Sequence, residues 1–214
     1  MMELEGLAIS PNESRRYLFV KRLMDIVLSL FGLIVLSPLF AVVACLIYME
    51  DAGKIIFCQD RNGKGDHIFR MYKFRSMRED APLLRAEMEK FNELDGPAFK
   101  IKNDPRVTRI GRFIRRTSID ELPQLVNILL GDMSLVGPRP LPTYETKQCT
   151  AYQKQRLLVK PGLTCYWQIS GRSDVRFDEW IEMDLKYIRE MSITTDLKIL
   201  LQTVKSVITG RGAY

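Results

Sequence analysis

The chain has 214 residues, 46% hydrophobic and 27% charged, which is the composition of a globular protein and excludes wholesale disorder. Its single histidine, His67, excludes most histidine-based zinc sites and disfavours a Ser-His-Asp triad. The four cysteines show no CxxC spacing, so free thiols in a reducing compartment are favoured over a metal cluster or a disulfide framework.

The first element along the chain is an apolar run without a charge, from Ile26 to Met49, inside a predicted membrane segment 23–50. A straight helix of this length would measure about 36 Å, which is enough to cross the hydrocarbon of a bilayer. Ser37-Pro38 lies near its middle. The proline should kink the helix, and the serine hydroxyl can satisfy a carbonyl that the proline leaves free.

The flanks of this run indicate its topology. Basic residues precede it, and the positive-inside rule places the N-terminal segment 1–22 in the cytoplasm: Arg15, Arg16, Lys21 and Arg22. Residues 51–214 are expected to form a cytoplasmic catalytic domain, so both ends need the same side. A re-entrant helix broken at Ser37-Pro38 meets this need, whereas a kinked single-pass anchor, the main alternative, does not. A cleaved signal peptide or a lipoprotein site at Cys45 is disfavoured, because the run is too long and stays apolar after that cysteine.

Short strands and a helix are predicted next. Residues 54–59 and 67–74 read as two strands around a turn at 61–66, and residues 79–94 have helical spacing.

A basic amphipathic helix is predicted over residues 104–116, with one apolar face and five arginines. This pattern suits the interface of an anionic membrane, and an ordinary solvated helix face is the alternative. Residues 177–190 and 195–209 predict two further helices. These are either core helices or interfacial ones, and their pattern does not decide between the two.

The stretch from Thr117 to Leu125 carries two adjacent acids, Asp120 and Glu121. Ser118 with Glu121 three residues later predicts a capping box that opens a helix ending near Leu130. Capping by itself accounts for Glu121, so the acids alone do not establish a catalytic role.

Arginines surround these acids in the sequence. Arg115 and Arg116 precede them, and Arg139 follows in the rigid turn of residues 131–140. Arginines beside a helix N-terminus form a phosphate-binding site, and carboxylates there can hold Mg²⁺ or attack phosphorus. The pattern therefore predicts phosphoryl chemistry at a membrane surface.

From about Lys21 to Tyr214 the chain resembles the bacterial sugar transferases, the monotopic polyprenyl-phosphate phosphoglycosyl transferases. Several motifs carry the resemblance in the same order: Lys21-Arg22 with Asp25, Ser37-Pro38, Gln59-x-Arg61-x-Gly63, Tyr72 to Met77, Asp104 to Thr108, Thr117 to Leu125, Gly131 to Pro140, Lys160 to Thr164, Trp167 to Arg172 and Gly210 to Tyr214.

This resemblance implies the transfer of a sugar 1-phosphate from a UDP-sugar to undecaprenyl phosphate, with release of UMP through a covalent phospho-sugar enzyme. Asp120 would be the nucleophile and a Mg²⁺ contact, and Glu121 would assist it as the base that prepares the lipid phosphate. The expected phosphate- and substrate-binding residues are Lys73, Arg75, Arg115, Arg116 and Arg139. The pathways implied are those of O-antigen, capsule or exopolysaccharide.

The expected fold is an α/β, mostly helical, membrane-associated domain with one re-entrant N-terminal membrane helix and amphipathic interfacial helices. It is expected at the cytoplasmic face of the bacterial inner membrane, as a homodimer by analogy with larger relatives. Those relatives carry extra N-terminal membrane helices, so the chain is expected to be a short member or a cut-down one. The sugar is not readable from the sequence.

A binding protein for anionic lipid or nucleic acid is the rival interpretation, since the net charge of +6 allows it. No helix-turn-helix, zinc-finger or RRM signature is present, and no nucleic-acid partner is expected.

Overall fold

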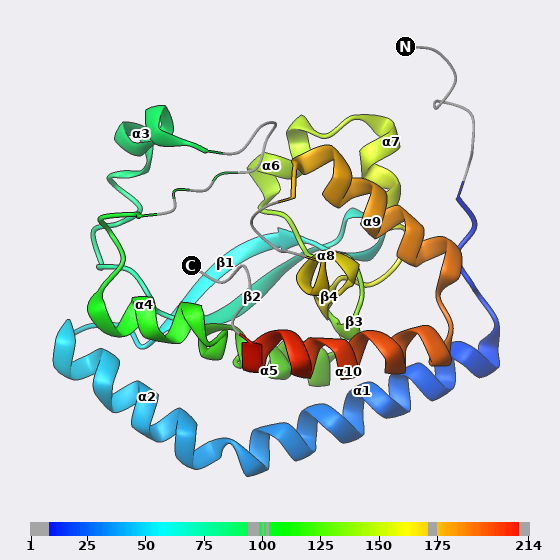
Figure 1. Cartoon of the computed structure of the whole chain (residues 1–214), viewed down its shortest axis with the longest axis horizontal. Helices are drawn as coiled ribbons and strands as arrows, with labels where there is room; N and C mark the ends of the chain where they lie inside the picture. The colour runs from blue at the N-terminus through cyan, green and yellow to red at the C-terminus, as the bar shows by residue number, and fades with distance from the viewer. Residues whose placement is uncertain (1–8, 94–98, 100, 102, 171–174, 210–214) are drawn as a thin grey trace.

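The computed structural model of the chain describes residues 9–93, 99, 101, 103–170 and 175–209. Over these residues it is a mostly helical α/β fold with two small two-stranded sheets (Figure 1). The expected fold class is confirmed in this coarse form.

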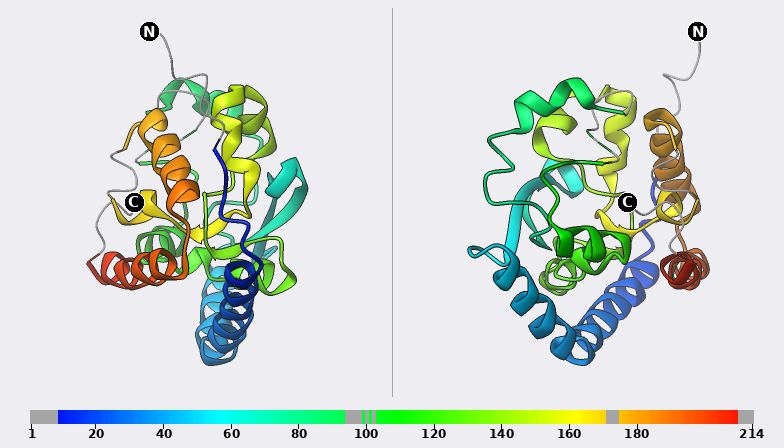
Figure 2. Two further views of the ribbon diagram at one scale, coloured as in Figure 1. Left: turned by 90° about the vertical axis from the view of Figure 1, so that its right-hand side faces the viewer. Right: turned by 60° about the vertical axis from the view of Figure 1, so that its left-hand side comes forward.

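Two N-terminal helices, α1 (Arg15–Val35) and α2 (Ser37–Glu50), form a wide V at one side of the molecule (Figures 1 and 2). They are bent by 60° at the break. In a straight helix Pro38 would be the residue that should donate to the Ile34 carbonyl, and proline has no N–H to give. The Ser37 hydroxyl donates to that carbonyl instead, at 2.8 Å. The predicted break at Ser37-Pro38 is therefore confirmed.

The helix pair leaves many apolar side chains exposed, among them Val27, Phe31, Ile34, Val35, Val42 and Met49. In the part of the chain that the structure describes, no single helix is both long and apolar enough to cross a membrane. The bent pair meets these requirements only when its two helices are taken together, in the manner of a broken span or a re-entrant loop.

A β-hairpin follows the helix pair, as predicted. Strands β1 (Ile56–Asn62) and β2 (Ile68–Phe74) pair antiparallel, and the 3-10 turn η1 (Lys64–Asp66) lies between them. Phe69 and Met71 alternate with exposed neighbours and face the core.

The helix predicted over residues 79–94 is largely absent. Only the short helix α3 (Arg85–Met88) and the turn η2 (Glu89–Phe91) form, and residue 94 lies outside the described residues. Leu83 and Phe91 are 83% and 52% exposed, and Leu84 and Met88 are only half-buried, so the described part of this apolar face is weakly packed. A short helix without such packing is marginal.

The basic helix α4 (Arg109–Arg116) begins later than the predicted residue 104. Upstream, Arg106 closes a turn through its backbone N–H and its guanidinium, both bonded to the Asp104 carboxylate at 2.6 to 3.0 Å. Thr108 then caps the helix by accepting from the Gly111 N–H at 2.9 Å. The side-chain turn thus replaces the first helical turn that the periodicity suggested.

The remaining elements build the body of the molecule. In chain order they are η3 (Ile119–Glu121), α5 (Gln124–Leu130), β3 (Ser134–Val136), α6 (Thr143–Gln148), α7 (Ala151–Lys154), η4 (Gln155–Leu158), β4 (Gly162–Thr164), α8 (Tyr166–Ile169), α9 (Phe177–Glu190) and α10 (Ile193–Thr209). Strands β3 and β4 pair in parallel. Gly137 and Gly162 pass so closely that a Cβ on Gly162 would lie 2.0 Å from the Gly137 nitrogen, so both positions need glycine.

The two C-terminal helices were predicted without a decision between core and interface. Helix α9 is a core helix, since Ile181, Leu185 and Ile188 are buried. Helix α10 is mixed: Ile199 is buried, whereas Leu201 is 74% exposed.

Charged side chains of α1 hold the bent helix pair against the rest of the fold. Lys21 donates to the Val136 carbonyl and pairs with Asp196, both within 2.9 Å. Arg22 donates to the carbonyls of Ile128 and Leu129 at the end of α5. Of the four residues that the sequence suggested as topology signals, Lys21 and Arg22 are thus engaged within the fold, whereas Arg15 and Arg16 are exposed.

Candidate active site

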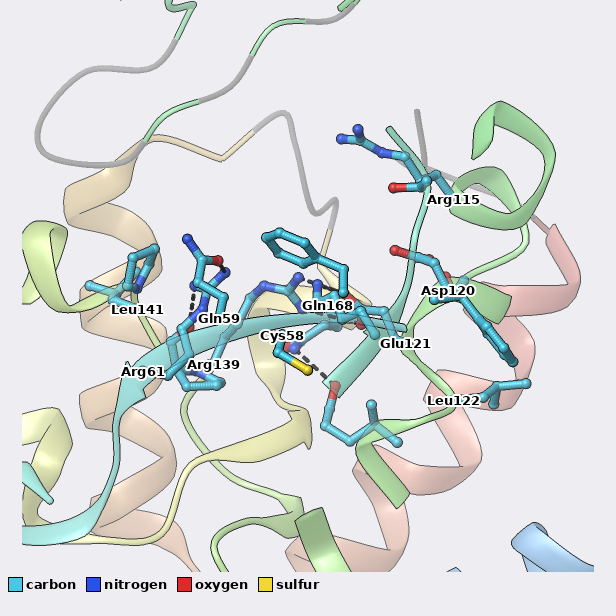
Figure 3. Close-up of a pocket in the computed structure, with 18 of the residues that line it drawn as sticks. Cys58, Gln59, Arg61, Arg115, Asp120, Glu121, Leu122, Arg139, Leu141 and Gln168 are labelled. Carbon is cyan, nitrogen blue, oxygen red and sulfur yellow. Dashed lines mark hydrogen bonds and ion pairs between the residues drawn. The ribbon is translucent and has the colours of Figure 1, made fainter. Parts of the chain in front are cut away.

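A large cleft of about 1560 Å³ lies between the hairpin, the end of α4, η3 and the turn after β3. Its polar lining includes the two predicted acids and several of the predicted cations: Lys73, Arg115, Asp120, Glu121 and Arg139. Residues far apart in the sequence therefore meet in one place, and Figure 3 shows most of them.

The predicted capping box is wrong. Ser118 adopts a left-handed conformation (φ 58°), and its side chain makes no capping bond. Asp120 and Glu121 lie in the 3-10 turn η3, and α5 starts only at Gln124, after Pro123. The Glu121 side chain does not fold back on Ser118 because two distant cations hold it.

Glu121 is clamped by Lys73 and Arg139. Its Oε1 accepts from Lys73 Nζ at 2.9 Å and from Arg139 Nη2 at 2.5 Å, and its Oε2 accepts from Arg139 Nη1 at 3.2 Å. Burial alone would raise the pKa of the Glu121 carboxyl, but Arg139 and Lys73 outweigh it and hold the pKa well below its usual range. Glu121 is therefore ionised throughout the physiological range.

Asp120, its neighbour, is in the opposite situation. It is only 8% exposed, and among the described residues its carboxylate has no hydrogen-bond or ion-pair partner. Burial, followed by the charge of Glu121, raises the pKa of Asp120 to about 6, although Lys73, Arg115 and Arg139 act against this. The carboxylate is thus surrounded by positive charge without being bonded to it.

Two more arginines contribute to this field. Arg115 lines the cleft from the end of α4, as predicted. Arg61 was not among the predicted site residues, although it lies in the Gln59-x-Arg61-x-Gly63 motif. It donates to the Pro140 carbonyl at 2.9 Å and to Gln59 at 2.6 Å, beside Arg139 (Figure 3). Burial and the Arg139 charge lower the pKa of Arg61 to about 10, so it remains a cation.

The structure does not bring the other two predicted cations to the acids. Arg75 lines the same cleft, but its guanidinium is bonded to the backbone and carboxylate of Asp51. Arg116 is exposed and is not part of the lining of this cleft in the described residues.

Asn127 joins strand β2, which carries Lys73, to helix α5, which follows the turn that carries Glu121. Its side-chain amide accepts from the Tyr72 N–H at 3.0 Å and donates to the Arg70 carbonyl at 2.8 Å. It therefore pairs with the free edge of β2 as a neighbouring strand would, from a position on α5. Sequence periodicity could not identify this contact, because its two partners are more than fifty residues away.

Contacts with Arg156 and Trp167 also hold Arg139 in position. The guanidinium of buried Arg156 donates to the Arg139 carbonyl at 2.6 Å and pairs with buried Asp184. The Arg139 guanidinium lies 5.5 Å from the centroid of the Trp167 ring, which is stacked on Trp180. These contacts hold the turn that presents Arg139 to Glu121.

A cluster of three side chains able to hold a metal is absent from the described residues. Mg²⁺ differs from most metals because it is usually bound through one or two carboxylates together with substrate phosphates. The Asp120 carboxylate, without a bonded partner, fits that kind of ligand, whereas both Glu121 oxygens are engaged.

Comparison with known proteins agrees with this chemistry. Residues 16–210 match the family described as bacterial sugar transferase. The chain is 47% identical over 198 residues to the galactosyl transferase CpsE of Streptococcus agalactiae, covering 92% of this chain and 44% of that protein. It is 42% identical to the undecaprenyl-phosphate galactose phosphotransferase of Salmonella typhimurium, covering 99% of this chain and 45% of the relative. It is 38% identical to the exopolysaccharide production protein ExoY of Sinorhizobium fredii, covering 91% and 88%. The chain therefore spans less than half the length of the first two relatives.

Proposed function

Because this chain belongs to the bacterial sugar transferase family, we propose that it is a phosphoglycosyl transferase acting on a UDP-sugar and undecaprenyl phosphate. It transfers a hexose 1-phosphate to the lipid and releases UMP, as an early membrane step in the synthesis of an extracellular polysaccharide. The names of the relatives support the lipid acceptor and the polysaccharide product.

The observation that carries the proposal is the state of Asp120. A buried carboxylate that has no bonded partner among the described residues, beside a cation-clamped glutamate, is available to attack phosphorus. Carboxylates are weak nucleophiles, but above their pKa they need no base to activate them. The cations Arg61, Arg115 and Arg139 offset the repulsion between an anionic nucleophile and an anionic diphosphate.

In the first step, an Asp120 carboxylate oxygen attacks the phosphorus that carries the sugar. A new Asp–O–P bond forms, the bond from that phosphorus to the bridging oxygen breaks, and UMP leaves with the electron pair. Arginines at the cleft stabilise the charge of the departing phosphate. No proton has to move in this step.

In the second step, an oxygen of the lipid phosphate attacks the same phosphorus. The Asp–O–P bond breaks, the Asp120 carboxylate is restored, and a lipid diphosphate sugar is formed. Glu121 stays ionised and holds Lys73 and Arg139 in place through both steps. Because its pKa is held so low, Glu121 is a poor proton acceptor, so we propose that it positions the two cations and that the lipid phosphate attacks in its ionised form.

Mg²⁺ is proposed to bind between Asp120 and the diphosphate, where it would neutralise phosphate charge and favour departure of UMP.

The bent helix pair is proposed to be re-entrant and to insert from the cytoplasmic side. The exposed arginines of α4, Arg109, Arg112 and Arg116, would then contact anionic headgroups. In this placement the cleft would lie at the level of the lipid headgroups. It could then bind both a donor dissolved in water and the phosphate group of the lipid.

The test uses the purified chain in nanodiscs with a panel of UDP-hexoses labelled in the phosphate that carries the sugar. We expect Mg²⁺-dependent UMP release and stoichiometric labelling of the protein without acceptor, and continued turnover only with undecaprenyl phosphate. Asp120→Asn should abolish both, whereas Asp178→Asn, an exposed aspartate on α9, should retain them. Full turnover by Asp120→Asn would disprove the assignment of the nucleophile, and the active UDP-hexose identifies the sugar.

A further inference from the structure

The cleft is not polar throughout. Beyond Asp120 and Glu121 its lining becomes largely aliphatic, beginning at Leu122, the residue next to Glu121. Thr164 and Thr203 also line this part, and their hydroxyls bond to each other at 2.7 Å. We name this part the aliphatic groove and define it by the following residues: Leu28, Leu122, Leu163, Leu200, Val204 and Val207. None of these side chains can bond to a sugar, a phosphate or a nucleobase.

Besides Leu122, three parts of the chain build the groove. Leu28 comes from α1, Leu163 from β4, and α10 contributes Leu200, Val204 and Val207. The spacing of the three α10 residues, i, i+4 and i+7, places them in one stripe along the helix. Asp196 and Ile199 are fully buried, so α10 is anchored by other positions and this stripe is free to face the cleft.

Leu163 and Leu200 are half-buried and pack against the core, whereas the outer groove residues remain exposed. Val204 is 59% exposed, Val207 37% and Leu28 41%. On α1 the apolar surface continues from Leu28 to Val27 and Phe31, which are 53% and 63% exposed. An apolar path therefore leads from the carboxylate pair to the outer surface of the bent helix pair.

We propose that the aliphatic groove binds the isoprenoid chain of the lipid acceptor. The proposal rests on the function proposed above, and it assigns where the second substrate lies. One end of the cleft is cationic and takes a phosphate, and the other end is aliphatic and opens beside the apolar helix pair. A long hydrocarbon chain that ends in a phosphate matches both ends at once. A nucleotide sugar has no such chain and matches only the cationic end.

The test separates the two steps of the reaction. Val204→Trp narrows the groove, and Val204→Gln and Val207→Gln make it polar. The matched control is Leu201→Gln on the same helix, because Leu201 is 74% exposed and does not line the cleft in the described residues. All three positions are surface-exposed on a helix, and the folding of the four variants is checked by thermal unfolding.

We expect the KM for undecaprenyl phosphate to rise about tenfold in the Val204 variants, since a tenfold change corresponds to losing the burial of roughly two methylene groups. UMP release without acceptor should show no matching loss. In the Val204 variants the preference for undecaprenyl phosphate over geranyl phosphate should also be smaller than in the wild type. Leu201→Gln should keep the wild-type KM and preference.

Three results would overturn the groove assignment. A wild-type KM for undecaprenyl phosphate in Val204→Trp would show that the chain lies elsewhere. An equal loss of UMP release would show that the groove serves the donor. An effect that vanishes in detergent without phospholipid would show that a bilayer lipid occupies it. Failure of the wild type itself to release UMP would instead contradict the proposed function.

Discussion

Asp120 and Glu121 are adjacent, similarly enclosed and chemically alike, yet the pKa values of their carboxyl groups are shifted in opposite directions. Glu121 binds both Lys73 and Arg139, so its pKa lies well below the usual range. Burial of Asp120 and the negative charge of Glu121 raise the pKa of Asp120 to about 6. Two carboxyl groups whose environments separate their pKa values are suited to different roles, here those of the proposed nucleophile and of its permanently charged partner.

The first prediction concerns pH and activity. The rate of UMP release without acceptor should rise with pH and level off above about 6, because only the ionised Asp120 attacks phosphorus. Single-turnover rates from pH 5 to pH 8 measure this. A rate that is flat across pH 6 would contradict the raised pKa of Asp120.

The second prediction concerns pH and stability. An acid whose pKa is raised by folding stabilises the protein fully below its unfolded pKa, and this contribution is lost as pH rises through the folded pKa. For Asp120 the loss falls between about pH 4 and pH 6. Asp120→Asn should therefore be more stable than the wild type at pH 8, by about 1 to 3 kcal/mol, with little difference at pH 4.

Urea unfolding of Asp120→Asn and of the control Asp178→Asn at both pH values checks this second prediction. Equal stability of wild type and Asp120→Asn at pH 8 would show that the ionised Asp120 carboxylate does not destabilise the folded protein.

At the scale of elements, short segments are held in place by side chains from elsewhere in the chain. Strand β2 has β1 on one edge, and on the other edge Asn127 of α5 bonds to Arg70 and Tyr72. Because Lys73 follows Tyr72 directly, this amide sets the distance between the lysine and the acids. The helix predicted at 79–94 shows the opposite case. In its described residues Arg106 donates to the Ala81 carbonyl at 3.3 Å, but Leu83 and Phe91 stay exposed and the helix does not extend.

The third prediction tests this link. Asn127→Ala should cost about 1 to 3 kcal/mol of stability, since it leaves the Tyr72 N–H and Arg70 carbonyl without their partner. It should also displace Lys73, whose charge lowers the pKa of Asp120, and so raise the pKa of Asp120 further. The acidic limb of the pH–rate profile should then move in Asn127→Ala and stay in Asn103→Ala, an exposed control. An unmoved limb in Asn127→Ala would mean that the amide serves stability only.

At the scale of the whole molecule, the bent helix pair is an integral part of the domain. Lys21, Arg22 and Asp25 of α1 bond to residues 128–136, which lie between the acids and Arg139. At the other end, Glu50 of α2 accepts from the Arg109 and Ile110 N–H groups at 2.7 and 2.8 Å, which fixes the start of α4. The depth of the helix pair in a membrane would therefore set the depth of the cleft.

The fourth prediction concerns topology. In a chain without its native cysteines, cysteines introduced at Ser10 and at Lys186 should both be protected from an impermeant reagent in intact cells, and both should react after lysis. Both positions are exposed, so burial does not protect them. Reaction of only one of the two in intact cells would establish a single-pass anchor and exclude the re-entrant arrangement.

Local chemistry in the sequence was enough for several features. The break at Pro38 follows from a missing N–H, the hairpin from alternation around a Gly-rich turn, and α9 from its apolar spacing. The acid pair and its flanking arginines also stand out as a site, because adjacent like charges need cations nearby. Each of these features depends on residues within a few positions of one another.

Only the tertiary structure decided the features that depend on partners far away in the sequence. Glu121 bonds to Lys73, 48 residues away, and not to Ser118. Arg61 joins the site although it was not among the residues predicted for it, while Arg75 is bound to Asp51 and Arg116 stays outside. The physical reason is that a local pattern fixes backbone preference, whereas burial and charge pairing depend on which distant groups the fold brings together. Those two quantities separate Asp120 from Glu121.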